Sequence, residues 1–328
     1  MKELKIEYKT KTVRLVFGRG VFTNSLFPEG RKYLVLTDEN VARLHGDKFK
    51  KISRFVKVLP PGEGSKTLDA ASSLVSFLLE EGFTKDDCLV ACGGGMITDL
   101  GGFVASVYKR GMGFISVPTT LLAQADSALG GKNGVNFASG EKTFKNQIGT
   151  IYQPELVAAD PLFLKTLPPE EFRSGLGEVL KCGLCFSPSL FARLRDGFDE
   201  NDIFECLSIK AEITAQDEFE EGARALLNYG HTLGHALESL SGFRLRHGEA
   251  VALGLLHETE EQSIKEKIRE LLEKYSFPEF RFDKRELAAY IRQDKKIRQG
   301  KIRLPVLKDI GMTELLETDF DAYLQRLL

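Results

Sequence analysis

The chain lacks a surplus of basic residues. Its 45 lysines and arginines stand against 47 aspartates and glutamates, so the formal net charge is −2 at pH 7. A protein without a broad positive field is not drawn strongly to the phosphate backbone of nucleic acids or to anionic membranes. We therefore expect no nucleic-acid partner.

Long apolar runs are also missing. No segment approaches the roughly 20 consecutive apolar residues that a membrane-spanning helix requires. The opening residues, MKELKIEYKT, contain no apolar signal core. We expect no membrane partner and a protein that remains in the cytoplasm.

Paired cysteines of the kind that form a disulfide framework are absent. The cysteines are odd in number and lie inside apolar segments, which is typical of reduced thiols in a reducing compartment; they are Cys88, Cys92, Cys182, Cys185 and Cys206. Cys182 and Cys185 have the spacing of a redox or zinc pair. Because no second pair exists, we interpret them as buried thiols of a helix.

The first half of the chain alternates short β-branched runs with helical patterns. With 328 residues, 42% of them hydrophobic, the chain can bury the core of one large or two medium domains. The strand-like runs between residues 13 and 118 are VRLVFG, YLVLTD, FVKVL, CLVAC and GFISVP. This alternation predicts an α/β domain of Rossmann type, with a doubly wound parallel sheet.

The second half has a different pattern. Amphipathic helical spacing dominates residues 169–185, 201–216, 223–240 and 248–275, so we predict an all-α domain. The proline-rich stretch QPELVAADPLFLKTLPPEEF lies between the two halves. We therefore expect one domain over residues 1–160 and a second over residues 161–328.

A run of three glycines, Gly93-Gly94-Gly95, follows the buried strand CLVAC and precedes a helical pattern. Glycine lets the backbone approach a pyrophosphate closely at a helix N-terminus. The spaced G-x-G-x-x-G fingerprint is absent, so a tight turn without a ligand remains an equal alternative. Carboxylates and a lysine in nearby loops, Asp38, Glu63 and Lys66, are candidate nucleotide contacts, or simple loop charges.

Three histidines of the second half can meet at one place. His231 and His235 are four residues apart in NYGHTLGHALE and project from one helix face, and His247 begins the next helix after a short turn. Imidazoles in this arrangement can bind zinc or a similar metal. The alternative is a helix face with hydrogen-bonded histidines, since the H-E-x-x-H glutamate is absent.

Read in chain order, several motifs resemble the signature blocks of the 3-dehydroquinate synthase family, within the sugar-phosphate cyclase superfamily. They cover most of residues 60–255 and read PPGEGSK, GGGMITDLGGFVASVYKRG, VPTTLLAQADSALGGKNGVN, SGLGEVLK, LLNYGHTLGHALE and HGEAVALGL. The resemblance implies an NAD-binding α/β domain followed by a helical domain that binds metal and substrate.

The resemblance also implies roles for individual residues. Zinc or cobalt would be bound by Glu178, His231 and His247, with His235 nearby to handle substrate. NAD would contact Asp38, Asn40, Glu63, Lys66, Gly94, Gly95, Asp99, Thr119, Thr120, Lys132 and Thr166. The substrate, a sugar acid phosphate with two anionic ends, would contact Lys132, Lys145, Asn146, Lys181, Lys210, Arg224, Asn228, Asp126, Glu220, Lys295 and Lys296.

Arg110 matches a residue that the family supplies across a dimer interface, so a homodimer is implied. Two stretches depart from the family pattern. The segment KNGVNFASGEKTFK is several residues longer than the usual loop, and EVLKCG stands where EVIKYG is common.

The implied reaction converts 3-deoxy-D-arabino-heptulosonate 7-phosphate into 3-dehydroquinate and phosphate, a step of the shikimate pathway. It would proceed by transient oxidation with NAD, phosphate elimination, re-reduction and intramolecular aldol closure. Alternatives are another sugar-phosphate cyclase such as 2-deoxy-scyllo-inosose synthase, a metal-dependent polyol dehydrogenase, and a non-catalytic nucleotide sensor. Lys210, Arg224 and Asn228 favour a carboxylated substrate.

Overall fold

The computed structural model describes residues 1–140, 142–291, 297–298 and 301–327. The chain forms two compact units. The sheet unit comprises Met1–Leu167 and Lys210–Phe219, and the helical unit comprises Pro168–Ile209 and Glu220–Leu328. The return of the chain to the sheet unit at residue 210 has no counterpart in the simple division at residue 160 that the sequence suggested.

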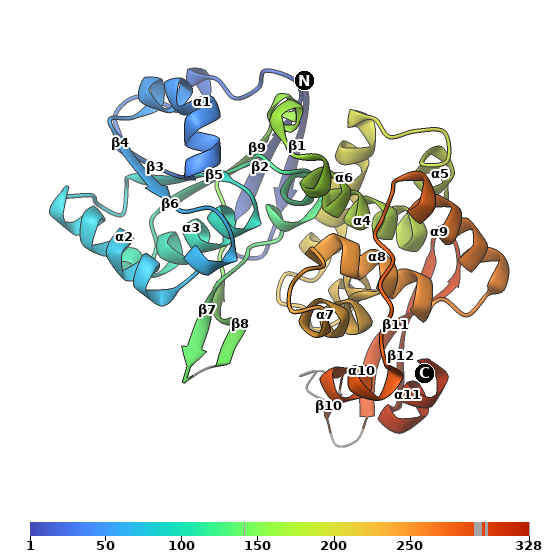
Figure 1. Cartoon of the computed structure of the whole chain (residues 1–328). Coiled ribbons are helices and arrows are strands. Elements are labelled where there is room, and N and C mark those ends of the chain that lie inside the picture. Colours follow the sequence, from blue (N-terminus) through green and yellow to red (C-terminus); the bar gives the residue numbers. More distant parts are fainter. Residues whose placement is uncertain (141, 292–296, 299–300, 328) are drawn as a thin grey trace. The chain divides into compact units, whose positions relative to one another are not determined.

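A seven-stranded sheet forms the centre of the sheet unit, in the order β1-β2-β9-β6-β5-β3-β4 (Figure 1). All neighbouring strands are parallel except β1 and β2, which are antiparallel. The strands are β1 Lys2–Glu7, β2 Thr12–Phe17, β3 Tyr33–Asp38, β4 Phe55–Leu59, β5 Cys88–Gly93, β6 Gly113–Pro118 and β9 Leu156–Ala159.

Helices cover both faces of this sheet, because successive buried side chains of a strand point to opposite faces. Leu34 and Leu36 of β3 belong to the apolar cluster that includes residues of α2 (Leu68–Glu80) and α3 (Gly95–Val107). Val35 belongs to the opposite cluster, with Phe49 of α1 (Glu39–Ile52). The predicted doubly wound parallel sheet is confirmed.

The segment longer than its family counterpart forms a β-hairpin that projects from the sheet unit in Figure 1. Strand β7, Lys132–Ser139, pairs antiparallel with β8, Lys142–Ile151, and the register shifts between Val135 and Phe137. The sequence predicted a long loop here. The hairpin forms because the strands on either side of Gly140, which has a φ of 59°, are rich in β-branched and aromatic residues.

The helical unit confirms the predicted helical character of the second half, with different boundaries. The helices are α4 Pro169–Phe186, α5 Pro188–Arg193, α6 Glu200–Gln216, α7 His231–Leu240, α8 His247–Glu258, α9 Gln262–Lys274, α10 Lys284–Ile291 and α11 Phe320–Leu327. Helix α6 continues into the sheet unit from Lys210. The helix expected over 223–240 is interrupted at Gly230, whose φ of 77° is left-handed, and the one expected over 248–275 ends at Glu258 and restarts at Gln262.

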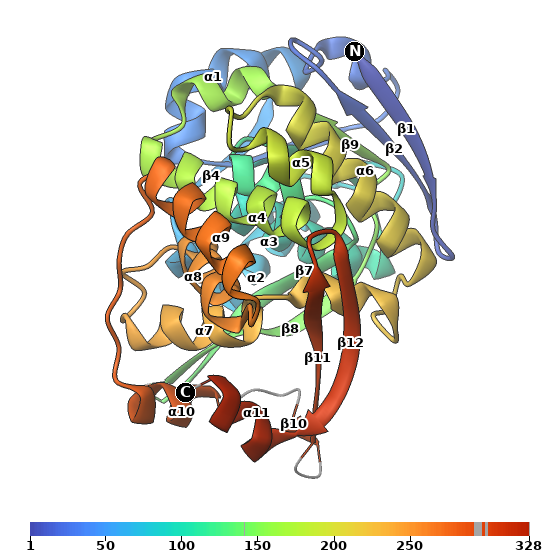
Figure 2. The ribbon, with the colours of Figure 1, turned by 90° about the vertical axis from the view of Figure 1, so that its right-hand side faces the viewer.

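The expectation that the second half contains only helices is wrong near its end. Strands β11, Lys301–Asp309, and β12, Met312–Asp319, form a long antiparallel hairpin, and β10, Ile297–Arg298, pairs with β11 (Figure 2). Ile302 and Leu304 of β11 alternate with exposed residues. This period of two marks a strand with one buried face.

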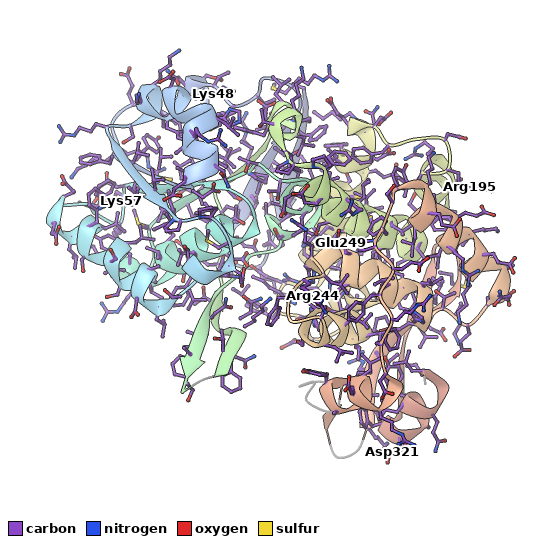
Figure 3. All side chains as sticks on the ribbon, in the orientation of Figure 1. Lys48, Lys57, Arg195, Arg244, Glu249 and Asp321 are labelled. Atoms are coloured by element: carbon purple, nitrogen blue, oxygen red, sulfur yellow. The ribbon has the colours of Figure 1, made fainter. Side chains whose placement is uncertain are left out.

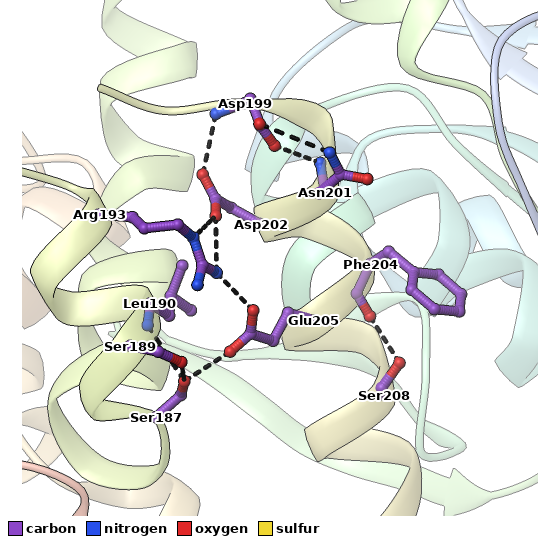
Figure 4. Close-up of polar contacts among 10 residues, drawn as sticks. All are labelled: Ser187, Ser189, Leu190, Arg193, Asp199, Asn201, Asp202, Phe204, Glu205 and Ser208. Carbon is purple, nitrogen blue, oxygen red and sulfur yellow. Dashed lines mark hydrogen bonds and ion pairs between the residues drawn. The ribbon is translucent and has the colours of Figure 1, made fainter. Parts of the chain in front are cut away.

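Polar contacts fix the junction between α5 and α6 (Figure 4). The Arg193 guanidinium donates to Asp202 Oδ1 at 3.0 and 3.1 Å and also pairs with Glu205. Ser187, which caps α5 by accepting from the Leu190 N–H, donates to Glu205. Such a capped and ion-paired corner fixes where the chain reverses direction.

Charged side chains of the chain differ in burial. Lys48, Arg195, Arg244 and Asp321 are exposed, whereas Glu249 is buried and pairs with Arg173 at 2.8 Å (Figure 3). The cysteines are buried free thiols, as predicted. Among the described residues, no helix combines the length and apolar character needed to cross a bilayer.

Candidate active site

The candidate nucleotide contacts gather at the carboxyl edge of the parallel sheet. The order in which successive strands join the sheet reverses at β3, since β4 lies on one side of β3 and β5 on the other, and all three strands are parallel. Ligands of open α/β sheets bind outside the carboxyl ends of the strands at such a switch point. The candidates that end or follow β3, β4, β5 and β6 in the chain are Asp38, Glu63, Gly94, Gly95, Thr119 and Thr120.

Asp38 ends β3 and caps α1. Its Oδ1 accepts the backbone N–H groups of Asn40 at 2.9 Å and Val41 at 3.1 Å. The capping bonds hold the carboxylate at the switch point, and the residue is 8% exposed. Asp38 is therefore a helix cap and not the simple loop charge that the sequence left as the alternative, and the cap fixes the position that a ribose contact would need.

The glycine run is tightly enclosed at the start of α3. A Cβ on Gly94 would lie 3.0 Å from Thr120 Cγ2, and one on Gly95 would lie 3.1 Å from Ser127 Oγ. Gly94 is the N-cap of α3 and has no side chain to cover the first N–H groups. Backbone at this turn can approach an anion in a way that a larger residue would obstruct.

Lys66 is the centre of a hydrogen-bonded group beside this turn. Its ammonium lies 2.6 Å from Asp99 Oδ2 and 2.6 Å from Asn146 Oδ1, and the side chain is 4% exposed. Burial raises the pKa of Asp99, while the Lys66 ammonium opposes the rise. Glu63 joins the same group because its Oε1 accepts from Asn136 Nδ2 at 2.8 Å.

The remaining nucleotide candidates lie at separate points of the sheet unit. Thr166 ends the 3-10 turn after β9, where its hydroxyl donates to the Phe163 carbonyl and lies 3.4 Å from Nε2 of His45 on α1. Lys132 begins β7 and is exposed, and Lys145 is half-buried on β8.

In the helical unit, three histidines converge as the sequence predicted. The ring centroids of His231, His235 and His247 are 5.3 to 5.7 Å apart. One ring nitrogen of each lies within 4.8 Å of the others. His231 and His247 are the first residues of α7 and α8, so their positions follow from where the two helices begin.

Glu178 of α4 lies against the same cluster. Its Oε1 is 3.5 Å from His231 Nε2 and 3.3 Å from His247 Nε2, and its Oε2 is 2.5 Å from Lys181 Nζ. The carboxylate is buried, and neither oxygen accepts a well-directed hydrogen bond among the described residues. A buried oxygen approached by two imidazole nitrogens is a donor set that suits zinc or cobalt.

Charge in this site is unevenly distributed. Burial raises the pKa of Glu178, but Lys181 and the two imidazoles outweigh it and hold that pKa well below its ordinary value. Burial, aided by the Lys181 ammonium, keeps the pKa of His231 well below its ordinary value. Glu178 is thus ionised and His231 neutral, which are the states in which these groups bind metals.

The imidazoles have further partners that orient them. His231 Nδ1 lies 3.2 Å from the Tyr229 carbonyl, and His247 Nδ1 lies 3.3 Å from Glu238 Oε2. Such contacts to the second ring nitrogen leave Nε2 of each ring directed at Glu178. Burial opposes charge on His247, but Glu178 and Glu238 outweigh it and raise the pKa of His247 to about 10, so this imidazole must release a proton when a metal binds.

The structure pairs some substrate candidates within each unit. In the sheet unit, Lys210 Nζ lies 2.7 Å from the Asp126 carbonyl and 2.9 Å from Asp126 Oδ1. In the helical unit, Asn228 donates to Glu220 at 2.9 Å, and Arg224, which lies between them in the sequence, is buried.

Arg110 and the two C-terminal lysines complete the set of candidates. Arg110 is exposed and has a left-handed φ of 64°. Lys295 and Lys296 lie outside the described residues.

Sequence reasoning missed two residues of these sites. Asn136 contacts Glu63, and Glu238 contacts His247. Glu238 is seven residues after His231, on the same side of the helix as the histidines, so helical spacing could have identified it. Asn136 carried no such signal, because its contact depends on the hairpin.

Two solved structures with this fold contain NAD+ and a metal ion. The chain superposes with a TM-score of 0.86 on 2-deoxy-scyllo-inosose synthase complexed with carbaglucose-6-phosphate, NAD+ and Co2+, at 25% identity over 99% of this chain and 98% of that one. It has the fold of 2-epi-5-epi-valiolone synthase from Streptomyces hygroscopicus, solved with NAD+ and Zn2+ bound, at a TM-score of 0.85, 22% identity and coverages of 99% and 96%.

Sequence comparisons cover the chain as well. The family descriptions "3-dehydroquinate synthase N-terminal" and "3-dehydroquinate synthase C-terminal" match residues 56–174 and 175–297. The 3-dehydroquinate synthase of Shewanella loihica is 36% identical over 100% of this chain and 99% of its own length. That of Streptococcus pyogenes serotype M49 is 45% identical over 69% of this chain and 66% of its own length.

The fold and the sequence comparisons together place the chain in the sugar-phosphate cyclase superfamily. Such enzymes remove phosphate from a sugar phosphate and close a carbocycle. Within this superfamily the chain belongs to the 3-dehydroquinate synthase family, and its activity is the phosphate-eliminating lyase reaction of that family in the shikimate pathway.

Proposed function

We propose that this activity depends on NAD bound at the glycine turn and on a zinc or cobalt ion bound by Glu178, His231 and His247. One observation carries the metal assignment: a single buried oxygen, Glu178 Oε1, lies within 3.5 Å of both Nε2 atoms. A three-histidine set with His235 is the alternative geometry. We favour Glu178 because it is ionised and buried, whereas His235 is exposed and remains accessible to substrate.

The bound groups supply a Lewis acid for a substrate hydroxyl and a reversible hydride acceptor. The protein's own residues bind and orient. Lys181 pairs with Oε2 of Glu178, which leaves Oε1 facing the two imidazoles. We assign no covalent nucleophile, because positioning and electrostatic stabilisation suffice for this reaction class.

Carboxyl-edge residues support the NAD assignment. The N–H groups at the start of α3 suit a pyrophosphate, and the capped carboxylate of Asp38 suits a ribose. We assign the other nucleotide contacts to Asn40, Glu63, Lys66, Asp99, Thr119, Thr120, Lys132 and Thr166. The 2-deoxy-scyllo-inosose synthase structure, which contains NAD+, supports this placement by similarity.

A substrate with a carboxylate and a phosphate requires several cations and hydroxyl-binding groups. We assign this role to Lys132, Lys145, Asn146, Lys181, Lys210, Arg224, Asn228, Asp126, Glu220, Lys295, Lys296 and His235. Lys210 and Asp126 already form a pair, as do Asn228 and Glu220. These pairs keep long side chains ordered before a ligand binds, which lowers the entropic cost of binding.

We also propose a homodimer to which Arg110 contributes. Its guanidinium lies on an exposed segment, and the left-handed φ of 64° directs the chain sharply after α3. A conformation that is uncommon for arginine is consistent with a functional demand on this position.

The test is direct. Purified protein is mixed with the heptulosonate phosphate, NAD and zinc or cobalt, and phosphate and 3-dehydroquinate are followed over time. We expect stoichiometric release of both without accumulation of absorbance near 340 nm. Sustained NADH accumulation would instead identify a net dehydrogenase, and turnover of glucose 6-phosphate but not of the heptulosonate would identify a different cyclase.

A further inference from the structure

The β7–β8 hairpin contains a bulge next to the nucleotide candidates. Val135 pairs with Ile148, and Phe137 pairs with Phe144, so Asn136 alone stands opposite residues 145–147. Bulges disrupt the ladder locally and redirect side chains, and they are common next to active sites. Here the bulge directs the side chains of Asn136 and Asn146 toward the loop after β4, as their contacts show.

Asn136 uses its whole amide and its backbone in these contacts. Its Nδ2 donates to Glu63 Oε1 at 2.8 Å, and its Oδ1 accepts from the Asn146 N–H at 3.0 Å. Its own N–H donates to the Lys66 carbonyl at 2.8 Å. The residue is 7% exposed, so these bonds are partly shielded from water.

Asn146 depends on this contact for its own geometry. Its φ of 52° is left-handed, and the bond from its N–H to Asn136 supports that conformation. In this conformation the Asn146 side chain lies 2.6 Å from Lys66 Nζ, which also contacts Asp99. One amide therefore connects Glu63, through the bulge, to the Lys66–Asp99 pair.

We propose that Asn136 is a positioning residue that sets Glu63 and Lys66 for NAD binding. The inference builds on the NAD site assigned in the proposed function, and Asn136 itself need not touch the nucleotide. An asparagine is required because the position must donate to a carboxylate and accept from an N–H at the same time. Aspartate has nearly the same shape, but it cannot donate.

This arrangement also accounts for how a longer hairpin is tolerated. The tip beyond the bulge carries Phe137 and Phe144, which are 40% and 45% exposed. Residues added there lengthen the free end of a ladder, whereas Asn136 and Asn146 stay fixed to the loop by their hydrogen bonds. The length of the tip can therefore change without moving the bulge.

A double-mutant cycle between Asn136 and Glu63 tests the proposal. Asn136→Asp sets two carboxylates against each other, so we expect the Kd for NAD to rise roughly five- to twentyfold, with kcat at saturating NAD changed less than threefold. In the Glu63→Gln background the new amide can donate to the introduced carboxylate. There, Asn136→Asp should raise the Kd for NAD by less than about threefold. Asn136→Ala should show no such rescue, since alanine cannot accept.

Gln147→Glu is the matched control. It makes the same amide-to-carboxylate change at an exposed position of the same bulge, and we expect the Kd for NAD to change less than twofold, as is usual for an exposed charge. Nucleotide binding is measured by isothermal titration calorimetry, and folding by thermal denaturation. If the single variant Asn136→Asp fails to fold, the rescue is still tested in the Glu63→Gln background. There, the Kd for NAD of Glu63→Gln is compared with that of the double variants that add Asn136→Asp or Asn136→Ala.

The outcomes are distinct. The positioning role would be overturned if Asn136→Asp raised the Kd for NAD by the same factor with Glu63 and with Gln at position 63. It would also be overturned if the two double variants, Glu63→Gln/Asn136→Asp and Glu63→Gln/Asn136→Ala, had the same Kd for NAD. Absence of NAD binding by the unmodified protein would overturn the proposed function instead.

Discussion

Lys181 and Glu178 form a buried ion pair one helical turn apart on α4. Nζ lies 2.5 Å from Oε2, and the two side chains are 4% and 1% exposed. Glu178 Oε1 contacts His231 and His247 at the same time. The two oxygens of one carboxylate thus have separate tasks: one balances a lysine, and the other faces the candidate metal site.

Removing one partner of this pair should damage stability as well as activity. Glu178→Gln leaves the Lys181 ammonium buried without a counter-charge, which costs about 3–5 kcal/mol. The double variant Glu178→Gln/Lys181→Met should recover most of that stability and remain inactive. Urea unfolding and the release of phosphate measure the two effects.

Lys308→Met is the control for this prediction. Lys308 pairs with Glu314 at 2.8 Å, but the two side chains are 47% and 57% exposed. Loss of an exposed pair costs about 0–1 kcal/mol. A Glu178→Gln variant no less stable than Lys308→Met would contradict the buried-pair argument.

Substitution of His235 should separate the two possible ligand sets. His235→Asn is expected to retain zinc through gel filtration and to lose turnover, whereas His231→Asn loses both. The reason is that His231 is buried and lies 3.5 Å from Glu178 Oε1, while His235 is exposed. Metal content by atomic absorption decides the matter: zinc loss on His235→Asn would favour the three-histidine set.

A methyl group at the glycine turn should weaken NAD binding. The Cβ of a Gly94→Ala variant would lie 3.0 Å from Thr120 Cγ2 and would cover the first turn of α3. We expect at least a tenfold rise in the Kd for NAD, equivalent to about 1.4 kcal/mol. Gly46→Ala is the control. A Cβ there meets nothing within 4 Å, so it should leave binding unchanged and stabilise α1 by about 0.5–1 kcal/mol.

Stability should fall in alkaline solution through buried thiols. Burial raises the pKa of the Cys185 thiol from 9.0 to about 12. Below pH 9 the folded and unfolded chains both keep this proton. Between these two pKa values only the unfolded chain releases it, so the free energy of unfolding falls by about 1.4 kcal/mol per pH unit.

Cys185→Ala should make this alkaline loss shallower by about that amount. Urea unfolding at pH 8, 9 and 10 measures the slope for both proteins. An unchanged slope would show that the thiol ionises equally in both states.

The parallel sheet could be predicted because its signal is local. Leu34, Val35 and Leu36 alternate between two buried faces, and a continuous apolar run between turn residues reports that arrangement directly. The C-terminal hairpin could not be predicted as readily. In β12 the burial alternates mostly between half-buried and exposed residues, so the hydrophobic contrast that marks a strand is weak.

Helix spacing also predicted part of the candidate metal site. His231 and His235 share a face at a separation of four, and a short turn brings His247 back to them. The approach of Glu178 is different, because no periodicity relates α4 to helices more than 40 residues later. Its place came from resemblance, and the fold supplies the physical reason through the packing of α4 against α8.

By itself, the sequence determined the elements whose periodicity is written in consecutive residues: the alternating strands, the glycine turn and the histidine face. Only the tertiary structure decided which side chains share a charge or a hydrogen bond across long separations, as Lys66 does with Asp99 and Asn136 with Glu63. The reason is that burial and distance set the strength of polar contacts, and both arise when separate elements pack together.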